Sequence, residues 1–589
     1  MATTNEHSVP AAQPAARRRQ GRTPPAENGS VPASAKPPRS AGRTKPPRVT
    51  ARVAAAGVRG AIAVCPCAAL RGTMRGMARA LARRGKRGRR AARVEALVAS
   101  WLDTLPADEG RWLVCEAAAW ALAWLARTRR AGSSAGGLLE RLVGEGRTAL
   151  DAVNGRDTRP ARFLLVCSRL FADVEACRCL EGPPRAALEE EIGRLVTPAG
   201  TIGLPGSVAM LERLVRWSAA RTGAAAAGGK PWHDATERRW AAAAAFGLRL
   251  LGDGGRILAA ADRLPSRASA ALVEAATDES RRPRRSRLRH TARRLTDWNR
   301  SREGKSLLPT DVHDAAAATT VIRSGWEPDA VRVLVGYRDA TPWLEIAVGD
   351  RLLVEGDWRW TAGLGERCLD AETGWQVSGW ESGRRAAFLE LSASLAGGMR
   401  LERQVVMLRR QRIVLLADVL TRGSEPVPAA TPISCRSVVP LAAGLETEAA
   451  AETRELVVFD TKPRFQALPL ALSEWRGVGS GSLAAGSGGL VVEQSGVGRL
   501  YAPLWLDCDP GRVGRPLTWR QLTVADTRRN LPRHQAAGFR VQVGVEQWLL
   551  YRALDVARNR TLLGCNVSSE FLLGRIRRSG EVARTLEIE

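Results

Sequence analysis

Short apolar runs, separated by polar turn residues, fill the second half of the sequence. In residues 400–420 (RLERQVVMLRRQRIVLLADVL), the apolar runs 405–408 and 413–416 flank the polar residues 409–412. Two such runs around a short polar segment predict a β-hairpin. Because the runs are continuous rather than alternating, we expect both faces of the hairpin to be covered, as inside stacked sheets. A single helix is the alternative, although its arginines would not share one face.

The same kind of pattern continues from residue 319 to residue 589, which we predict to be one domain. Gly349-Asp350 predicts a tight turn between two of its strands. Many short strands without intervening helices indicate antiparallel sheets stacked as a large β-sandwich, with tryptophans in its core. The first strands of this domain are predicted at 319–323, 331–337, 343–348 and 351–354.

Residues 94–300 have a different pattern, in which apolar positions recur at helical spacing. Glycine and proline divide this part into roughly eight to ten helices with short connections. Such helices pack antiparallel, so we expect an all-α bundle or an incomplete (α/α) toroid. The predicted helical runs are 111–127, 137–143, 160–171, 185–196, 208–220, 235–251 and 255–264, with a basic linker or docking helix at 281–295 and a linker at 301–318.

The formal net charge of +29 is concentrated at the start of the chain, since residues 1–100 hold 21 Lys and Arg against three acids. Residues 1–93 are therefore predicted to be a disordered basic arm. Within it, Arg71, Arg75, Arg79 and Arg83 are spaced by four and would line one helical face. The segment 17–93 could bind nucleic acid or an anionic surface. The alternative is a solvated tail, because the excess of Arg over Lys indicates codon bias rather than a partner.

Other classes of function receive little support. No segment has the ~20 apolar residues needed to span a bilayer, and no signal peptide is evident, so a cytoplasmic protein is the default expectation. Ten scattered cysteines include two C-x-C pairs, Cys65/Cys67 and Cys177/Cys179. Zinc sites usually have wider gaps and four ligands. We therefore predict no metal site, and no cofactor motif is present.

Residues 319–360 (TTVIRSGWEPDAVRVLVGYRDATPWLEIAVGDRLLVEGDWRW) resemble the start of the C-terminal β-domain of the heparinase II/III-like family. The similarity lies in a strand ending in Arg323-Ser324, followed by paired strands and a hairpin from Gly349 to Gly356. It implies a polysaccharide-lyase-like protein, in which a helical domain precedes a β-sandwich. An acidic polysaccharide would then be the partner.

The resemblance also implies a chemistry. Lyases of this kind abstract the C5 proton of a uronic acid with a Tyr or His base, and a further group neutralises the carboxylate. The family's His-rich segment should fall near residues 337–345, which contain no His here, and the helical domain contains none of the three Tyr. We therefore expect the lyase activity to be lost or altered.

The remaining catalytic candidates are Tyr337, Arg338 and His313, as acid, carboxylate clamp and base. A surface turn and a linker histidine are the structural alternatives. Binding candidates are Asp339 and Arg323, with Trp358 and Trp360 as possible sugar-stacking rings, for which the sandwich core is the alternative. Three hypotheses follow: binding of acidic polysaccharide without normal lyase chemistry, an active lyase, or a non-catalytic scaffold attached through its basic arm.

Overall fold

A computed structural model describes most of the chain after residue 46. The predictions for residues 1–46, 259–264, 281–285 and 301–305 lie outside the described part. Among the described helices, none has the length and apolarity to cross a lipid bilayer. The described residues are 47–65, 67–83, 87–108, 110–128, 133–258, 286–296, 306–422, 431–477, 479–527 and 529–589.

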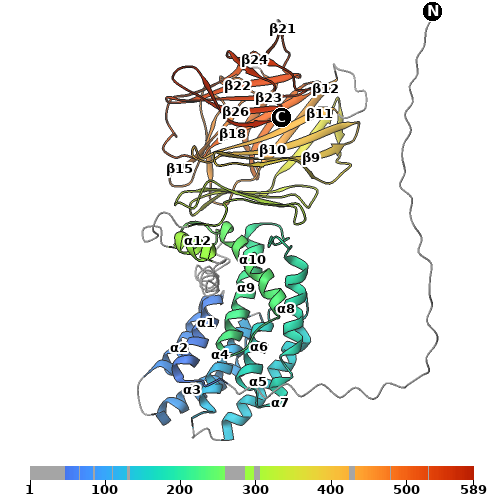
Figure 1. The fold of residues 1–589 in the computed structure, drawn as a ribbon. Coiled ribbons are helices and arrows are strands. Elements are labelled where there is room, and N and C mark those ends of the chain that lie inside the picture. The colour runs from blue at the N-terminus through green and yellow to red at the C-terminus, as the bar shows by residue number, and fades with distance from the viewer. Residues whose placement is uncertain are drawn as a thin grey trace, which may run out of the picture. The chain divides into compact units, whose positions relative to one another are not determined.

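The first part of the described chain is helical (Figure 1), which the apolar spacing predicted for residues 94–300. Helices of 10 to 20 residues alternate with short connections, apart from one short helix and one 3-10 turn. The elements are α1 (Ala51–Val64), α2 (Ala68–Ala82), α3 (Arg87–Asp103), α4 (Gly110–Leu125), α5 (Ser133–Ala152), α6 (Ala161–Leu170), α7 (Glu175–Arg178), α8 (Gly182–Leu195), α9 (Ser207–Ala226), α10 (Asp234–Leu250), η1 (Asp253–Gly255) and α12 (Ser286–Thr296).

Helix α4 is the centre of the first helical core. Every residue from Val114 to Leu125 is buried, as expected for a helix that is apolar on all sides. Its one acid, Glu116, pairs with Arg162 of α6 at 2.6 Å. Helix α1 packs closely against it, because a Cβ atom at Gly57 would lie 2.3 Å from the Trp120 ring. Only glycine allows this approach.

The predicted disordered arm is wrong for the residues that form α1 and α2. Their apolar side chains recur at helical spacing and enter the core around α4; Val58, Met74, Met77 and Leu81 are fully buried. Thr50 caps α1 by accepting a hydrogen bond from the Val53 backbone nitrogen at 3.3 Å. The net charge of the segment concealed this apolar face, whose burial against α4 drives folding.

The predicted linkers are also partly structured. Residues 286–296 form α12, in which Leu288, Ala292 and Leu295 are buried in a second helical core, so this segment is a docked helix. The first strand, β1 (Val312–Asp314), lies inside the segment expected to be a linker. The predicted helix 255–264 is wrong for residues 256–258, which have no helical structure.

From residue 306 onward the described chain forms strands without intervening helices, and every strand pair is antiparallel. The first two sheets contain the strands that were predicted most accurately. The first has the order β1, β2 (Thr319–Arg323), β3 (Val331–Gly336), β4 (Trp343–Val348), β5 (Arg351–Asp357). The second has the order β13 (Glu446–Ala449), β14 (Leu456–Phe459), β15 (Pro463–Pro469), β18 (Leu500–Asp507), β11 (Ile413–Arg422), β10 (Met399–Leu408), β9 (Ala386–Leu395), β8 (Gln376–Ser382).

Three further sheets, two with five strands and one with four, complete the described part of the β-domain. One has the order β16 (Gly481–Gly486), β17 (Gly489–Val497), β12 (Pro432–Val439), β6 (Arg359–Leu364), β7 (Arg367–Leu369). Another has the order β19 (Leu517–Leu522), β22 (Ala536–Val543), β23 (Glu546–Ala553), β26 (Phe571–Ile576), β27 (Val582–Ile588). The last has the order β21 (Arg529–Asn530), β20 (Ala525–Asp526), β24 (Arg560–Leu562), β25 (Cys565–Val567).

The predicted hairpin is confirmed as β10 and β11, joined by residues 409–412 with Leu408 opposite Ile413. Figure 1 shows both strands inside the sheet, with β9 and β18 on either side. Val405 and Met407 enter one hydrophobic core, and Val406 and Leu408 enter another. Both faces are therefore covered, as the continuous apolar runs indicated.

Candidate functional site

The predicted base, His313, and the predicted acid, Tyr337, are neighbours in the structure. His313 lies on β1 and Tyr337 directly follows β3, and both strands pair with β2. Their ring centroids are 6.5 Å apart and the rings are stacked at 12°. Strand pairing thus brings together two of the three residues that the sequence proposed as a catalytic group.

Tyr337 is poorly placed to act as an acid. Its side chain is only 4% exposed and belongs to the sandwich core, and its hydroxyl has no hydrogen-bond partner among the described residues. Burial, with a smaller effect of the nearby Asp314 charge, raises the pKa of Tyr337 to about 12. A phenol that is enclosed and hard to ionise is a weak candidate for proton transfer to a substrate.

His313 is half-buried and is held by two further contacts. Its Nδ1 lies 2.9 Å from the Thr320 hydroxyl, and its ring stacks on Trp380 with centroids 5.1 Å apart. Burial lowers the pKa of His313 below its usual 6.5, although the Asp314 charge opposes this shift. The imidazole is therefore mainly neutral at pH 7, the form that can accept a proton.

The loop after α8 lies beside this group. Thr197 donates a hydrogen bond to Asp314 at 2.5 Å. Burial alone would raise the pKa of Asp314, but hydrogen bonds from Thr197, Thr201 and two backbone nitrogens lower it overall. Asp314 is therefore a fixed charge between the helical part and β1.

Arg338, the predicted carboxylate clamp, is exposed next to Tyr337. Its Nη2 donates to the Ala317 carbonyl at 3.1 Å. The same atom lies 3.0 Å from where a Cβ atom of Gly203 would be, so the guanidinium also borders the loop after α8. Asp339 is exposed beside it. Arg338 and Asp339 therefore present one cation and one anion directly after Tyr337, the neighbour of His313.

The other predicted binding residues do not form an open sugar-binding surface. Arg323 is 3% exposed, and its Nη1 donates to the Leu251 carbonyl at 2.8 Å at the end of α10. Trp358 is 1% exposed and donates to the Ser437 hydroxyl. Both side chains thus have structural partners within the fold, and their predicted binding roles stay predictions. Trp360 is half-buried and packs edge-on against Trp375, with centroids 6.2 Å apart.

Sequence reasoning missed Trp380 and Thr197. Trp380 occurs in the predicted β-domain, but its stacking on His313 depends on a packing between two sheets that no local pattern records. Thr197 and Asp314 are far apart in sequence, so their contact was not foreseeable. Within the described residues, no group of three His, Cys, Asp or Glu side chains could hold a metal ion.

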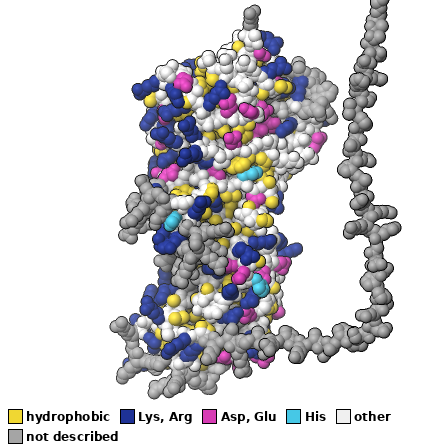
Figure 2. All heavy atoms as spheres, in the orientation of Figure 1, with side chains coloured by type: hydrophobic (Ala, Val, Ile, Leu, Met, Phe, Trp, Pro, Cys, Tyr) yellow, Lys and Arg dark blue, Asp and Glu magenta, His cyan; other side chains and the backbone are white. Residues whose placement is uncertain are grey.

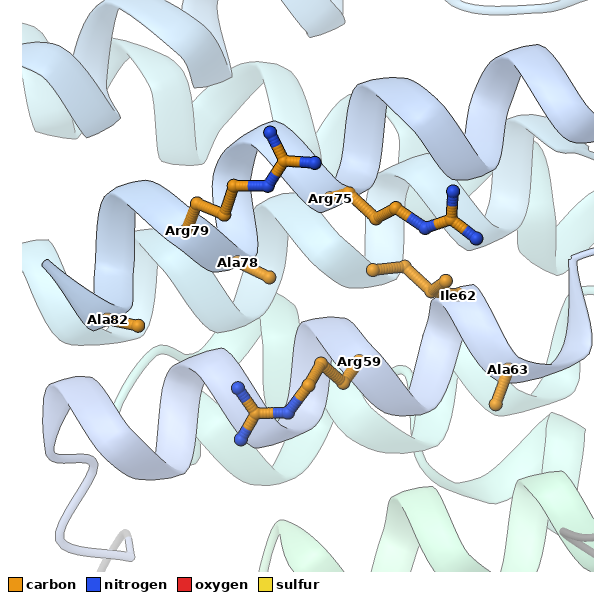
Figure 3. A pocket seen from close by; sticks show the side chains of 7 residues that line it. All are labelled: Arg59, Ile62, Ala63, Arg75, Ala78, Arg79 and Ala82. Atoms are coloured by element: carbon orange, nitrogen blue, oxygen red, sulfur yellow. The ribbon is translucent and has the colours of Figure 1, made fainter.

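A separate basic groove lies between α1 and α2 (Figure 3). Arg59 projects from α1, and Arg75 and Arg79 project from α2, around a floor that includes Ile62 and Ala78. The groove has a volume of about 310 Å³. Arg75 and Arg79, two of the arginines spaced by four in the sequence, thus line one side of this α1–α2 groove. The groove is formed by two folded helices.

Basic side chains are not confined to this groove. Figure 2 shows Lys and Arg side chains spread over much of one face of the molecule, with Asp and Glu side chains among them. Net charge alone therefore does not identify a binding site. A binding site has to be identified from the local arrangement of side chains.

Comparison with solved structures identifies the fold as heparinase-like. The chain matches a mutant heparan sulfate lyase HepC from Pedobacter heparinus with a TM-score of 0.51 and 11% identity, over 79% of each chain. It also matches the heparinase III-BT4657 gene product with a TM-score of 0.51 and 10% identity, over 78% of this chain and 81% of that one. No protein-family model matches the chain, and no curated protein matches its sequence. At this identity the likeness concerns the fold.

Proposed function

We propose that this protein binds acidic polysaccharide around His313 and Arg338, at the junction between the loop after α8 and the first sheet of the β-domain. We also propose that its lyase chemistry is lost or altered. The heparinase-like fold, which extends over both the helical part and the β-domain, carries the proposal. An exposed guanidinium beside the loop after α8 is suited to a carboxylate or sulfate group.

The altered chemistry is inferred from the surroundings of Tyr337. β-Elimination requires a base for the C5 proton and an acid for the leaving oxygen. His313 could supply the base, but the Tyr337 hydroxyl is enclosed, and burial raises its pKa to about 12. The other two tyrosines, Tyr501 and Tyr551, are also buried in the β-domain.

Affinity electrophoresis in gels containing heparin, alginate or hyaluronan tests the binding. We expect at least one polymer to retard the protein, with less retardation at high salt because the contacts are ionic. Arg338→Gln should reduce the retardation more than the matched variant Arg367→Gln, whose arginine is exposed on β7. Equal mobility in all gels would refute the proposal.

Ultraviolet absorbance tests the chemistry, since elimination creates a new C=C bond. We expect no increase with any of the three polymers. An increase that is lost in His313→Gln would instead establish an active lyase with His313 as its base.

The α1–α2 groove supports a second candidate function, attachment to an anionic polymer or surface through Arg59, Arg75 and Arg79. In this role the protein would be a scaffold, and the junction around His313 would not be needed. The lining of the groove contains no aromatic residue on which nucleic-acid bases could stack.

A further inference from the structure

A second polar cavity lies in the β-domain, where three of the sheets meet. It has a volume of about 250 Å³. Strands β17 and β18 contribute one side, and β19, β22 and the turn before β22 contribute the other. None of its lining residues belongs to the junction around His313. Its lining comprises Ala471, Ser480, Gln494, Ser495, Gly496, Val497, Arg499, Leu500, Tyr501, Gln521, Arg533, His534, Ala537 and Phe539.

The charged residues of this cavity are all basic. Arg499 and Arg533 line it together with His534, and no Asp or Glu is present in the lining. In the described part of the chain, neither guanidinium has an ion pair or a side-chain hydrogen bond. Two unpaired guanidiniums at one cavity are suited to an anionic ligand.

The position of each arginine is fixed by the strands. Arg499 occupies the tight turn between β17 and β18, where its backbone nitrogen donates to the Val497 carbonyl at 2.9 Å. Arg533 lies in the turn closed by the hydrogen bond from the Gln535 nitrogen to the Pro532 carbonyl at 3.0 Å. Because both turns are held by their own hydrogen bonds, the backbone positions from which the two side chains reach the cavity are fixed.

The rest of the lining matches a sugar better than a simple anion. Tyr501 and Phe539 form a buried aromatic pair with centroids 6.1 Å apart, which gives the cavity an apolar part beside its polar groups. Gln494 and Gln521 supply amide groups for hydroxyls. Tyr501 is unsuited to catalysis, because its hydroxyl donates to Gln404 at 3.2 Å and burial raises its pKa above the usual value. The lining therefore offers groups that can bind a sugar, whereas Tyr501 is not suited to catalysis.

We propose that this cavity, named here the Arg499–Arg533 site, binds one carboxylated or sulfated sugar unit of an acidic polysaccharide. The site is smaller than the roughly 300–1,000 Å³ of pockets for drug-sized ligands, which agrees with a single sugar unit. The class of ligand rests on the proposed function, whereas the location of the site rests on the lining of the cavity. A polymer bound here and at the junction would be held at two places, which increases its overall affinity.

The experiment compares three variants of the whole chain by calorimetric titration with a hyaluronan tetrasaccharide and a heparin tetrasaccharide. The first is R499Q/R533Q, and the second is Arg338→Gln at the junction. The third, R515Q/R578Q, is a control that removes two exposed arginines of the same domain. Because all the substituted side chains lie at the surface or at a cavity, we expect thermal unfolding to be unchanged.

We expect R499Q/R533Q to weaken binding of at least one tetrasaccharide about tenfold or more, since charge-assisted hydrogen bonds to the ligand would be lost. The control should change it little. Neutral cellotetraose and inorganic sulfate should each bind more weakly than the tetrasaccharide. Equal weakening in R499Q/R533Q and the control would overturn the site, and so would sulfate binding as strong as tetrasaccharide binding.

The two proposals fail in different ways. Weakening by Arg338→Gln alone would refute the Arg499–Arg533 site and leave the proposed function in place. Weakening by R499Q/R533Q alone would support this site and place binding away from the junction. Failure of both tetrasaccharides to bind the unaltered protein would refute both.

Discussion

The carboxylate of Glu345 on β4 accepts a hydrogen bond from the backbone nitrogen of Ser207, the first residue of α9, at 2.7 Å. Glu345 is fully buried and also pairs with the buried Arg332 at 3.3 Å. A negative charge at a helix N-terminus is favourable, because the first backbone N–H groups of a helix have no partner within it. One side chain of the β-domain thus satisfies both a helix end and a buried cation.

This arrangement predicts a large effect of Glu345→Gln on stability. The amide can still accept a hydrogen bond from Ser207, but it cannot neutralise Arg332, whose buried charge is then balanced only by the smaller effect of Glu355. We expect the free energy of unfolding to fall by about 3 kcal/mol, measured by urea denaturation. Glu366→Gln, at an exposed turn position, should change it by less than about 0.5 kcal/mol. Similar small values for both would show that the pair contributes little.

The shifted pKa of His313 predicts a dependence of stability on pH. Burial lowers the pKa of His313 in the folded protein, so the unfolded chain binds the proton more readily. Stability is therefore lost as pH falls through the unfolded value of 6.5 toward the lower folded value. We expect His313→Gln to lose less stability than the unaltered protein between about pH 7.5 and pH 5.5.

The control for His313 is His233→Gln, whose side chain is 72% exposed. Urea denaturation of the unaltered protein and of both variants at the two pH values distinguishes the half-buried His313 from an exposed histidine that contacts Glu189. If His313→Gln left the pH dependence unchanged, the burial of His313 would have no energetic consequence.

Tyr337→Phe should not destabilise the protein. The hydroxyl that it removes is buried without a partner among the described residues, and such a group costs free energy. We expect the free energy of unfolding to stay constant or rise by up to about 1 kcal/mol. Tyr551→Phe is the contrast, because the Tyr551 hydroxyl accepts a hydrogen bond from Arg560 at 3.0 Å. That variant should lose about 1–3 kcal/mol.

Tyr337→Phe also tests the proposed function. Retardation by acidic polysaccharide should be the same in this variant as in the unaltered protein, because the hydroxyl is enclosed. A loss of binding with unchanged stability would place the hydroxyl in contact with the ligand.

The α1–α2 groove predicts a charge-specific contribution to the binding of polyanions. Replacing Arg59, Arg75 and Arg79 together by Gln should make the protein elute from a heparin column at lower salt, since fewer ionic contacts remain. The control replaces Arg147, Arg156 and Arg238, which are exposed elsewhere in the helical part. Equal shifts for the two triple variants would mean that only net charge matters.

The order of helices and strands was determined by local sequence pattern. The hairpin formed by β10 and β11 was predictable because its two apolar runs and polar tip lie within one short stretch. The tip also shows the limit of such reasoning. Arg409, one of the four polar residues of the tip, is 8% exposed and is neutralised by Asp311, which lies far away in sequence. A charge can be buried when a distant part of the chain supplies its partner.

Tertiary structure alone decided the folding of α1 and α2 and the composition of the candidate site. The arm appeared disordered because its charge outweighed an apolar face that is stable only against α4. In the site, sequence proposed His313, Tyr337 and Arg338, but packing decided that Tyr337 is enclosed and that Trp380 stacks on His313. Periodicity along a chain records which faces are apolar, whereas burial and pairing depend on residues that only the fold brings together.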